Sequence, residues 1–393
     1  MALVNIPEEL VELRSSLRQF IEREVKPIED EHREEILETS VYEGIKDDRM
    51  KLRRRSAELG FYAAHMPEDV GGSGLPYLGQ VLLHEEIHRG GSILSGQEAL
   101  LPIVTGPTPI YLGCTDVQKE KYLAPLVRAD KTTCFALTEP GAGSDATRIK
   151  TKAEKTDGGW LLNGRKHFIT GGDYADFALV FAVTDAEKRA QGGITALFVD
   201  ADSKGYSVTR LQRTMSPWQN PAELTFEDVE VPDENVLGEV GYGFYSAVKG
   251  INGARLQISA NALGTAEYLL ARSMEYANDR VAFERPISAN QFVQGHLVDS
   301  YAELEMARLL VYKLADDIDN GADGRKEAAL AKLVATETAG RIADRAIQVH
   351  GGNGFMTELG IEVWAREVRA MRLYEGTSEI LRTNIAKTLG VAG

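Results

Sequence analysis

The run His84-Glu-Glu-Ile-His88 is the motif in this chain that most directly suggests chemistry. It matches H-E-x-x-H, in which two histidines one helical turn apart bind zinc and the glutamate activates a water molecule. A zinc site needs a third protein ligand, and no further histidine follows at the expected distance. Short motifs with two free positions often arise by chance, and packing between helices is their more common role. We therefore predict no metal and keep a zinc-dependent hydrolase using His84, Glu85 and His88 as an alternative.

A second candidate is Glu375, which is followed directly by Gly376 in the run Tyr374-Glu-Gly-Thr-Ser-Glu-Ile380. A carboxylate at the start of a helix is stabilised by the helix dipole, which is a purely structural reason for its presence. The same carboxylate could act as a base, because the adjacent glycine lets a ligand approach the backbone. These residues alone leave both interpretations open.

The segment 135–145, FALTEPGAGSD, could hold a ligand through its backbone. Thr138 offers a hydroxyl, two glycines let main-chain N–H groups approach a flat or anionic ligand, and Ser144 and Asp145 can close the turn. A tight turn without a ligand is the other interpretation. No G-x-G-x-x-G, P-loop or G-x-S-x-G motif occurs in the required context. The sequence therefore predicts neither a Rossmann nucleotide site nor a serine-hydrolase nucleophile.

Composition excludes several classes of protein. Among 393 residues, 44 Lys and Arg stand against 59 Asp and Glu, and the net charge of −15 repels nucleic acid and anionic membrane surfaces. No apolar run is long enough to predict a membrane span. Two cysteines, Cys114 and Cys134, are too few for a disulfide framework. The N-terminus shows no signal or transit pattern, so we expect a cytoplasmic protein.

Periodicity divides the chain into three parts that must position these residues. Apolar residues recur every three or four positions in 1–130 and in 238–393, which predicts an N-terminal all-α domain and a C-terminal bundle of long helices. Thr115 and Gln118 match a capping box. Short β-branched and aromatic runs fill 131–237, with Asp157-Gly158-Gly159 and Asn163-Gly164 expected at tight hairpins. The predicted fold class is α+β multidomain, with an antiparallel β-barrel or sandwich in the middle.

Five motifs in their order and spacing resemble those of the acyl-CoA dehydrogenases. They are TEPGAGSD (138–145), NGRKHFIT (163–170), RVAF (280–283) followed by Gln291, QVHGGNG (348–354) and YEGTSEI (374–380). The resemblance covers nearly the whole chain. It implies a homotetramer whose subunits have an N-terminal helical domain, a middle β-barrel and a C-terminal four-helix bundle. It also implies FAD held without a Rossmann fold, which would account for the missing dinucleotide motif.

The resemblance further implies a set of cofactor and substrate contacts. The segment 135–144, Phe168 and Thr170 would lie against the flavin, and a second group would hold the ADP half of a neighbouring subunit's FAD. The implied FAD-binding residues are Phe135, Leu137, Thr138, Gly143, Ser144, Phe168, Thr170, Arg280, Phe283, Gln291, Gln348, Gly351, Gly352, Thr377 and Glu379. The implied substrate-binding residues are Ser144, Asn252, Arg255 and Gly376.

By the same resemblance, Glu375 is the catalytic base. It would take the α-proton of an acyl thioester while flavin N5 accepts the hydride from Cβ, which leaves a trans-2-enoyl-CoA. A carboxylate desolvated by bound substrate has a raised pKa and is a stronger base. The backbone N–H of Glu375 and a ribityl hydroxyl of FAD would stabilise the thioester oxygen. A subgroup carries its base near position 254, where this chain has Ala254, and Arg255 would be the cation beside Glu375.

Two positions depart from the family pattern. Glu284 stands where R-x-x-F-G-x-P has glycine, and Asn252 stands where an aspartate is common. We expect an FAD-dependent acyl-CoA dehydrogenase of the fatty-acid β-oxidation type, which passes electrons to an electron-transfer flavoprotein. Besides the zinc hydrolase, the alternatives are a relative that acts on a different activated acid or runs as a reductase, and a cofactor-free assembly protein. The sequence does not predict acyl length or branching.

Overall fold

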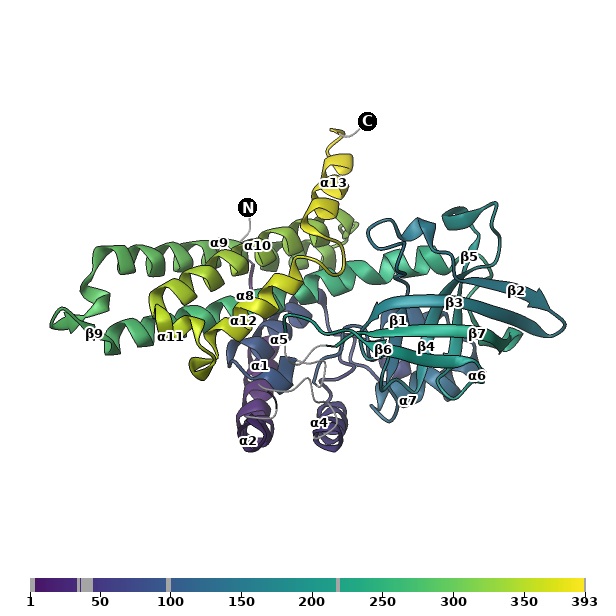
Figure 1. Cartoon of the computed structure of the whole chain (residues 1–393), viewed down its shortest axis with the longest axis horizontal. Helices are drawn as coiled ribbons and strands as arrows, with labels where there is room; N and C mark the ends of the chain where they lie inside the picture. The colour runs from purple at the N-terminus through teal and green to yellow at the C-terminus, as the bar shows by residue number, and fades with distance from the viewer. Residues whose placement is uncertain (1–3, 34–35, 37–44, 97–99, 217–219, 392–393) are drawn as a thin grey trace. The chain divides into compact units, whose positions relative to one another are not determined.

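The computed structural model describes residues 4–33, 36, 45–96, 100–216 and 220–391, and Figure 1 shows the course of the chain. Packing divides the chain into two compact units. Unit 1 comprises residues 1–31, 76–96 and 252–393, and unit 2 comprises residues 32–75 and 97–251. Parts of the N-terminal third therefore belong to each unit. The predicted domain boundaries after residues 130 and 237 stay a prediction.

Unit 1 is built from helices, as predicted for the C-terminal part. Its N-terminal helices are α1 (Glu8–Phe20), a π-helical turn (Ile21–Val25), α2 (Lys26–Glu31) and α5 (Tyr77–Arg89). The remaining helices are α8 (Gly243–Asp279, in unit 1 from residue 252), α9 (Gln291–Asp319), α10 (Arg325–His350), α11 (Gly352–Phe355), α12 (Ile361–Met371) and α13 (Ser378–Thr388). A short hairpin of β9 (Val281–Ala282) and β10 (Arg285–Pro286) joins α8 to α9. Helix α5 packs against α1 and α9, and α10 packs against α9, α12 and α13.

The sequence of α10 explains why it can occupy the centre of this packing. Its buried face is rich in alanine, including Ala328, Ala331, Ala335 and Ala339. Small side chains let neighbouring helices approach closely, and alanine has the highest helix propensity. One lysine, Lys332, interrupts this apolar face and is fully buried. It is therefore a residue that needs a specific partner.

Local capping fixes where the helices of unit 1 begin. The side chain of Asn290 accepts the Phe292 N–H at the start of α9, and that of Thr377 accepts the Ile380 N–H at the start of α13. Gly324 precedes α10 with φ +81°, a conformation that favours glycine. Because Thr377 is the cap, the residues just before it lie outside the helix, in the turn that leads into α13.

Unit 2 combines a sheet with short helices. Its strands are β1 (Thr133–Ala136), β2 (Lys152–Thr156), β3 (Gly159–Ile169), β4 (Phe177–Val183), β5 (Ile194–Asp200), β6 (Tyr206–Leu211), β7 (Ala222–Pro232) and β8 (Val236–Leu237). Its α-helices are α4 (Lys46–Glu58), α6 (Asp116–Gln118) and α7 (Ala124–Val127). In the described part of the chain, the strand order is β6-β7-β3-β2-β4-β5-β8, with β1 added beside β4. Most pairs are antiparallel as predicted, but β4 pairs in parallel with β1 and β2, so the sheet is mixed.

Strand β4 shows where the core of unit 2 lies. Alternate side chains point to opposite faces of a strand. On one face, Phe177, Leu179 and Phe181 pack in a core with Tyr122 and Phe198, while the alanines and valine between them join a second core on the other face. A strand buried on both faces reads as a continuous apolar run, which is how FALVFAV appears in the sequence.

Turn chemistry was predicted correctly in two of three places. Thr115 and Gln118 form the expected capping box, and Asp157-Gly158 forms the tight turn between β2 and β3, where Thr156 pairs with Gly159. The hairpin expected at Asn163-Gly164 was wrong. Gly164 lies inside β3 at a register shift opposite β7, and a Cβ there would meet the backbone of Thr151 at 2.6 Å. Among the described residues, none of the helices is long and apolar enough to cross a membrane.

Candidate functional site

The predicted base lies in the segment 372–377, which joins α12 to α13 in unit 1. Glu375 has φ +53° and Gly376 has φ +95°, so two consecutive residues adopt left-handed conformations. For a residue other than glycine, this conformation costs about 1–2 kcal/mol, which the surrounding contacts must offset. The side chain of Glu375 is half-buried. The glutamate–glycine pair therefore marks a strained turn and not simply the first residue of a helix.

Two cations from neighbouring helices hold this turn. Arg255 of α8 donates through Nε to the carbonyl oxygen of Glu375 at 3.1 Å. Lys332 of α10 donates through Nζ to the carbonyl oxygen of Gly376 at 2.9 Å, and its ammonium lies 5.9 Å from the ring centre of Tyr374. The structure thus brings together Glu375, Gly376 and Arg255 from the predicted site. Sequence reasoning missed Lys332, although a lysine inside an alanine-rich apolar helix was a signal that could have found it.

Burial alters the proton affinity of both cations. It lowers the pKa of Lys332 to about 8, against the opposing effect of the Glu375 charge and with a further reduction from Arg255. Burial also lowers the pKa of Arg255, again opposed by Glu375. Both cations would shift further toward their neutral forms without the nearby carboxylate. The three charged groups therefore form one electrostatic unit.

Glu337 of α10 holds the two ends of the same segment. Its carboxylate lies 2.8 Å from Nη2 of Arg372 and accepts the hydroxyl of Ser378 at 2.6 Å. The carbonyl of Arg372 accepts the Ser378 N–H at 3.2 Å, which closes the loop. Helix α10 thus contacts the segment at both ends through Glu337 and at the Glu375–Gly376 turn through Lys332.

Three more residues considered in the sequence are neighbours along the chain of Arg255 or of the turn. The side-chain oxygen of Asn252 accepts from Nη1 of Arg255 at 3.4 Å. Ala254, the position of the base in a subgroup of relatives, carries no carboxylate and is half-buried. Glu379 is exposed in the first turn of α13, and hydrogen bonds from its own N–H and from Thr377 lower its pKa.

In unit 2, the segment after β1 is anchored by a buried ion pair. Nζ of Lys166 on β3 donates to Glu139 at 2.9 Å and to the carbonyl of Leu137 at 3.0 Å. Glu139 also accepts the N–H groups of Lys150 and Thr151 at 2.6 and 2.9 Å. Both members of the pair are buried. Burial lowers the pKa of Lys166 to about 8 despite the attraction of Glu139.

The segment after β1 and the end of β3 both expose groups that could contact a ligand. A Cβ atom added at Gly141 or Gly143 would meet no atom within 4 Å. Phe168, at the end of β3, has φ +59° and is 60% exposed, and the hydroxyl residues Ser144 and Thr170 are exposed. An exposed aromatic ring, an exposed glycine backbone and hydroxyls fit a flat cofactor with phosphates such as FAD. Thr138 is half-buried. Leu137 is buried and Phe135 packs on the ring of Phe181, so Leu137 and Phe135 anchor this segment to the core of unit 2.

The remaining predicted cofactor residues gather at one end of unit 1. Arg280, Phe283 and Gln291 lie at the exposed β9–β10 hairpin and the start of α9. Exposed residues Gln348, Gly351 and Gly352 lie at the end of α10. Asn353 of this second group donates to the hydroxyl of Tyr276 on α8 at 3.0 Å, which links it to the end of α8. Figure 1 shows β9 and α11 at this end.

The β9–β10 hairpin turn shows why a glycine would suit position 284, where this chain has glutamate. Phe283 and Glu284 have φ +52° and +65°, which is the geometry of a two-residue type I′ turn. Glycine is favoured at such positions, so Glu284 adopts the conformation at an energetic cost. Phe283 is 96% exposed. The backbone conformation is thus retained while its usual residue is replaced.

These residues lie far from the Glu375 turn of the same chain. Lys332 touches the turn near the start of α10, and Gln348 lies near its end, about 24 Å away at 1.5 Å per residue. One flavin ring held at Glu375 therefore cannot also contact Gln348 of the same chain. The binding of a neighbouring subunit's FAD by these residues, which the sequence resemblance implied, stays a prediction.

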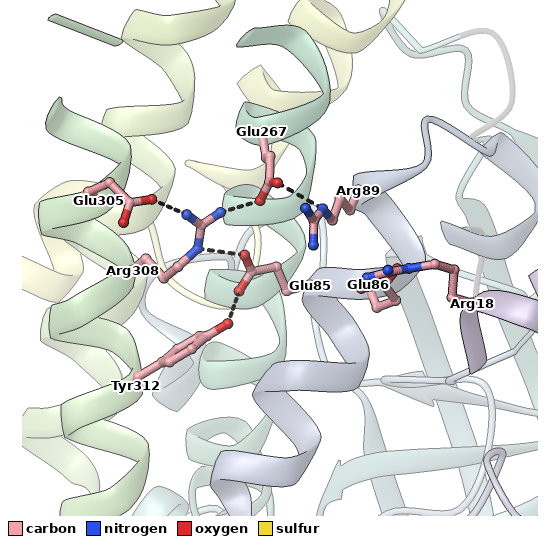
Figure 2. Close-up of polar contacts among 8 residues, drawn as sticks. All are labelled: Arg18, Glu85, Glu86, Arg89, Glu267, Glu305, Arg308 and Tyr312. Carbon is pink, nitrogen blue, oxygen red and sulfur yellow. Dashed lines mark hydrogen bonds and ion pairs between the residues drawn. The ribbon is translucent and has the colours of Figure 1, made fainter. Parts of the chain in front are cut away.

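The histidine motif on α5 lies inside unit 1 in a network of ion pairs (Figure 2). Glu85 accepts from Nε of Arg308 at 2.7 Å and from the hydroxyl of Tyr312 at 2.6 Å. The other two guanidinium nitrogens of Arg308 donate to Glu267 and Glu305. Burial raises the pKa of Glu85 although Arg308 and Tyr312 oppose that effect. On Arg308, burial alone would lower the pKa, but Glu85 and Glu267 raise it.

The other members of the motif also have protein partners. Nδ1 of His84 lies 3.1 Å from the side-chain amide of Asn261. Nδ1 of His88 lies 3.4 Å from the hydroxyl of Thr265, and burial lowers the pKa of His88 to about 3. Glu86 pairs with Arg18 of α1 at 2.5 and 2.8 Å. Among the residues that the structure describes, no three His, Cys, Asp or Glu side chains lie close enough together to hold a metal ion. The geometry therefore gives the zinc-hydrolase alternative no third ligand and gives Glu85 a structural role.

Family models match each third of the chain. Residues 7–130 match the acyl-CoA dehydrogenase N-terminal domain, 134–229 the middle domain and 241–390 the C-terminal domain. The chain belongs to the acyl-CoA dehydrogenase family. As a member, it is an FAD-dependent oxidoreductase.

Three relatives illustrate the range of the family. The chain is 38% identical to a 3-(aryl)acrylate reductase of Clostridium sporogenes over 96% of this chain and 97% of the relative. It is 37% identical to a caffeyl-CoA reductase–Etf complex subunit of Acetobacterium woodii over 85% and 88%. The structure of butyryl-CoA dehydrogenase from Megasphaera elsdenii aligns with a TM-score of 0.88 at 33% identity, covering 99% of this chain and 100% of the other.

Proposed function

We propose that this protein removes two hydrogens from an acyl-CoA thioester to give a trans-2-enoyl-CoA, with Glu375 as the base. The observation that carries the proposal is the strained Glu375–Gly376 turn, whose two carbonyls are bonded by a half-buried arginine from α8 and a buried lysine from α10. A turn that needs such support, and that presents a half-buried carboxylate, is suited to holding a base in one orientation.

The chain's own groups have defined tasks in this reaction. The carboxylate of Glu375 accepts the proton from Cα, and the electrons of that C–H bond form the new double bond as Cβ loses a hydride. FAD, when bound, supplies the acceptor for this hydride. The backbone N–H of Glu375 donates to the thioester oxygen, where negative charge develops. Gly376 keeps that approach open because it has no side chain.

Cofactor contacts are proposed from both units. In unit 2, Thr138, Gly143, Ser144, Phe168 and Thr170 would line the flavin and its pyrophosphate. In unit 1, the group at the end of α10 and the β9–β10 hairpin would hold the ADP half of a neighbouring subunit's FAD. Thr377 and Glu379 would contact the cofactor near its adenosine and pyrophosphate. Asn252, Arg255 and Ser144 would lie near the thioester.

We further propose a homotetramer that passes electrons to an electron-transfer flavoprotein. Apolar side chains of α9, namely Val298, Tyr301, Met306 and Leu309, are exposed along one stripe of the helix, and Phe292 is 87% exposed. A subunit interface over this face would cover them. The flavoprotein acceptor is supported by the relative named as part of an Etf complex.

A second candidate direction is reduction of an aryl-substituted 2-enoyl thioester. Two relatives named as reductases of arylacrylate or caffeyl-CoA favour it. The same residues would serve, because Glu375 would then give its proton to Cα. The substrate class and direction are decided by one screen with straight-chain, branched and aryl acyl-CoA thioesters and their 2-enoyl counterparts.

The test of the base compares E375Q with E230Q. Glu230 is an exposed carboxylate on β7 in unit 2, so its loss should change neither step. Anaerobic mixing with the preferred acyl-CoA should bleach the flavin of wild type and E230Q. E375Q should keep its flavin spectrum and bleach at least about 10²-fold more slowly, the lower contribution of a positioned base. Bleaching of E375Q at the wild-type rate would disprove the assignment.

A further inference from the structure

Lys332 is a fully buried lysine whose ammonium donates a hydrogen bond to the carbonyl oxygen of Gly376 at 2.9 Å. Placing an ammonium in an apolar helix face is costly unless it is paired. The depressed pKa of this group, about 8, reflects that cost. A methionine or leucine would pack among the alanines of α10 without it. The lysine therefore needs an explanation beyond packing.

The contact falls on the second residue of the strained turn. Arg255 bonds the Glu375 carbonyl and Lys332 bonds the Gly376 carbonyl, so the two peptide groups that follow the base are each fixed by a cation. Left-handed conformations at two consecutive residues persist only where the surroundings hold them. The Gly376 carbonyl belongs to the peptide group that joins Gly376 to Thr377, so the Lys332 bond restrains the backbone dihedral angles on either side of that planar group, directly after the base.

Helix α10 is suited to transmit this constraint. It packs against α9, α12 and α13, and Glu337, five residues after Lys332, fixes both ends of the segment that carries the turn. Glu337 contacts Arg372 and Ser378 at these ends, whereas Lys332 contacts the Gly376 carbonyl between them. Lys332 supplies the third point of attachment.

We propose that Lys332 is a positioning residue for the base: by holding the Gly376 carbonyl, it keeps the Glu375 carboxylate aimed at the substrate α-carbon. It acts through the backbone and does not touch the reacting atoms. This inference rests on the proposed function, since it takes Glu375 to be the base. The removal of Lys332 should therefore impair proton abstraction in protein that is folded and carries FAD.

The variant K332M removes the donor while keeping an unbranched chain of similar length. T336V is the matched control, because Thr336 lies one turn further along α10, is equally buried, and bonds only to the Lys332 carbonyl of its own helix. The probe is 3,3-dimethylbutanoyl-CoA, which has α-hydrogens but no hydrogen on Cβ. Exchange of its α-hydrogens for deuterium, followed by mass spectrometry, reports proton abstraction without hydride transfer.

We expect K332M to bind FAD and the thioester within about threefold of wild type and to lose at least about tenfold in the rate of α-exchange. Misplacing a catalytic group by about 1 Å can cost about 10²-fold. T336V should exchange at the wild-type rate. Exchange by K332M within twofold of wild type, or a loss that only matches the fraction of protein without FAD, would overturn the proposal.

A second measurement covers the case in which K332M does not fold. K332Q keeps a neutral donor of shorter reach, and amide hydrogen exchange of 372–380 in K332Q should be faster than in T336V while other helices stay unchanged. Wild-type protection of this segment together with wild-type α-exchange would refute the role of Lys332. E375Q separates the two hypotheses: α-exchange retained in E375Q disproves the base, whereas exchange lost in E375Q but retained in K332M disproves only the positioning role.

Discussion

Replacing Arg308 by methionine tests whether the HEEIH motif serves packing or chemistry. Arg308 is the centre of the network in Figure 2 and contacts Glu85, Glu267 and Glu305. Glu267 keeps Arg89 at 2.7 Å in the variant, and Glu305 is 39% exposed along its side chain. Glu85 is 5% exposed. Of its two hydrogen bonds drawn in Figure 2, it loses the one from Arg308 and keeps the one from Tyr312. The energetic effect of R308M therefore falls mainly on Glu85.

The size of that effect has an upper limit. A buried carboxylate that loses its cation can take up a proton, which removes the cost of an unpaired buried charge. At pH 7, protonation from an ordinary pKa of 4.5 costs about 3 kcal/mol, at about 1.36 kcal/mol per pH unit. We expect R308M to lower the free energy of unfolding by about 2–3 kcal/mol at pH 7. At pH 5 the same limit falls to about 1 kcal/mol.

The sign follows from the direction of the pKa shift. Burial already raises the pKa of Glu85 in the native protein, and removal of Arg308 raises it further. The folded state of R308M then binds a proton that the unfolded state releases between pH 5 and 7. Its stability relative to wild type therefore rises as the pH falls.

A double-mutant cycle completes the test. E85Q replaces the carboxylate by a neutral amide of the same shape and should cost about 1 kcal/mol or less, because it removes a buried charge. R308M combined with E85Q should recover about 2 kcal/mol relative to R308M alone. E85Q should also bleach its flavin at the wild-type rate, whereas a zinc hydrolase would need Glu85 as its base.

Urea unfolding followed by circular dichroism at 222 nm suits this measurement, because unit 1 is helical. It is run at pH 5 and pH 7 with wild type, both single variants and the double variant. The variant R325M is the surface control, since Arg325 pairs with Asp323 where both side chains are at least 67% exposed, and it should change stability by less than about 1 kcal/mol. A loss of less than 1 kcal/mol in R308M at pH 7, or an equal loss at both pH values, would refute the reasoning.

Three further predictions concern the turn, the cofactor and the assembly. E284G should raise stability by up to about 1 kcal/mol in a thermal melt, because Glu284 has φ +65°; a lower melting temperature would contradict the strain argument. G143D should fold, because a Cβ at this position points into open space. It should bind FAD at least about tenfold more weakly in fluorescence titration of the apoprotein, with G143A intermediate, because the added charge repels the pyrophosphate. Unchanged affinity in G143D would exclude this face as the cofactor site. F292E should reduce the mass measured by light scattering, whereas V117E, which alters a 66% exposed valine of unit 2, should not; a tetramer in F292E would place the interface elsewhere.

The sequence determined the features that depend on local pattern. Periodicity gave the helices of unit 1 and the strands of unit 2, and the capping box at Thr115 and the turn at Asp157-Gly158 were predicted because neighbouring residues settle them. The five spaced motifs led to the family and hence to FAD. Glu375 and Arg255 were named as partners, and the structure brings them together through a 3.1 Å hydrogen bond to the Glu375 carbonyl.

Other features could be read only from the folded chain, because they depend on which distant residue lies opposite. Gly164 has the composition of a hairpin turn, but pairing between β3 and β7 places it at a bulge. Parallel pairing of β1 and β2 with β4 depends on where the chain returns to the sheet, which local propensity does not encode.

The candidate site shows the same division between local and tertiary information. Nothing in the local sequence distinguishes Glu85, whose chemical motif ends in a buried ion network, from Glu375, which lies in a strained turn. Arg308 is 223 residues from Glu85, and Lys332 is 44 residues from Gly376. Residue types and spacing determined which groups this protein carries. Packing of α5, α8, α9 and α10 decided which of those groups meet, because a buried charge takes its role from the partner that tertiary structure provides.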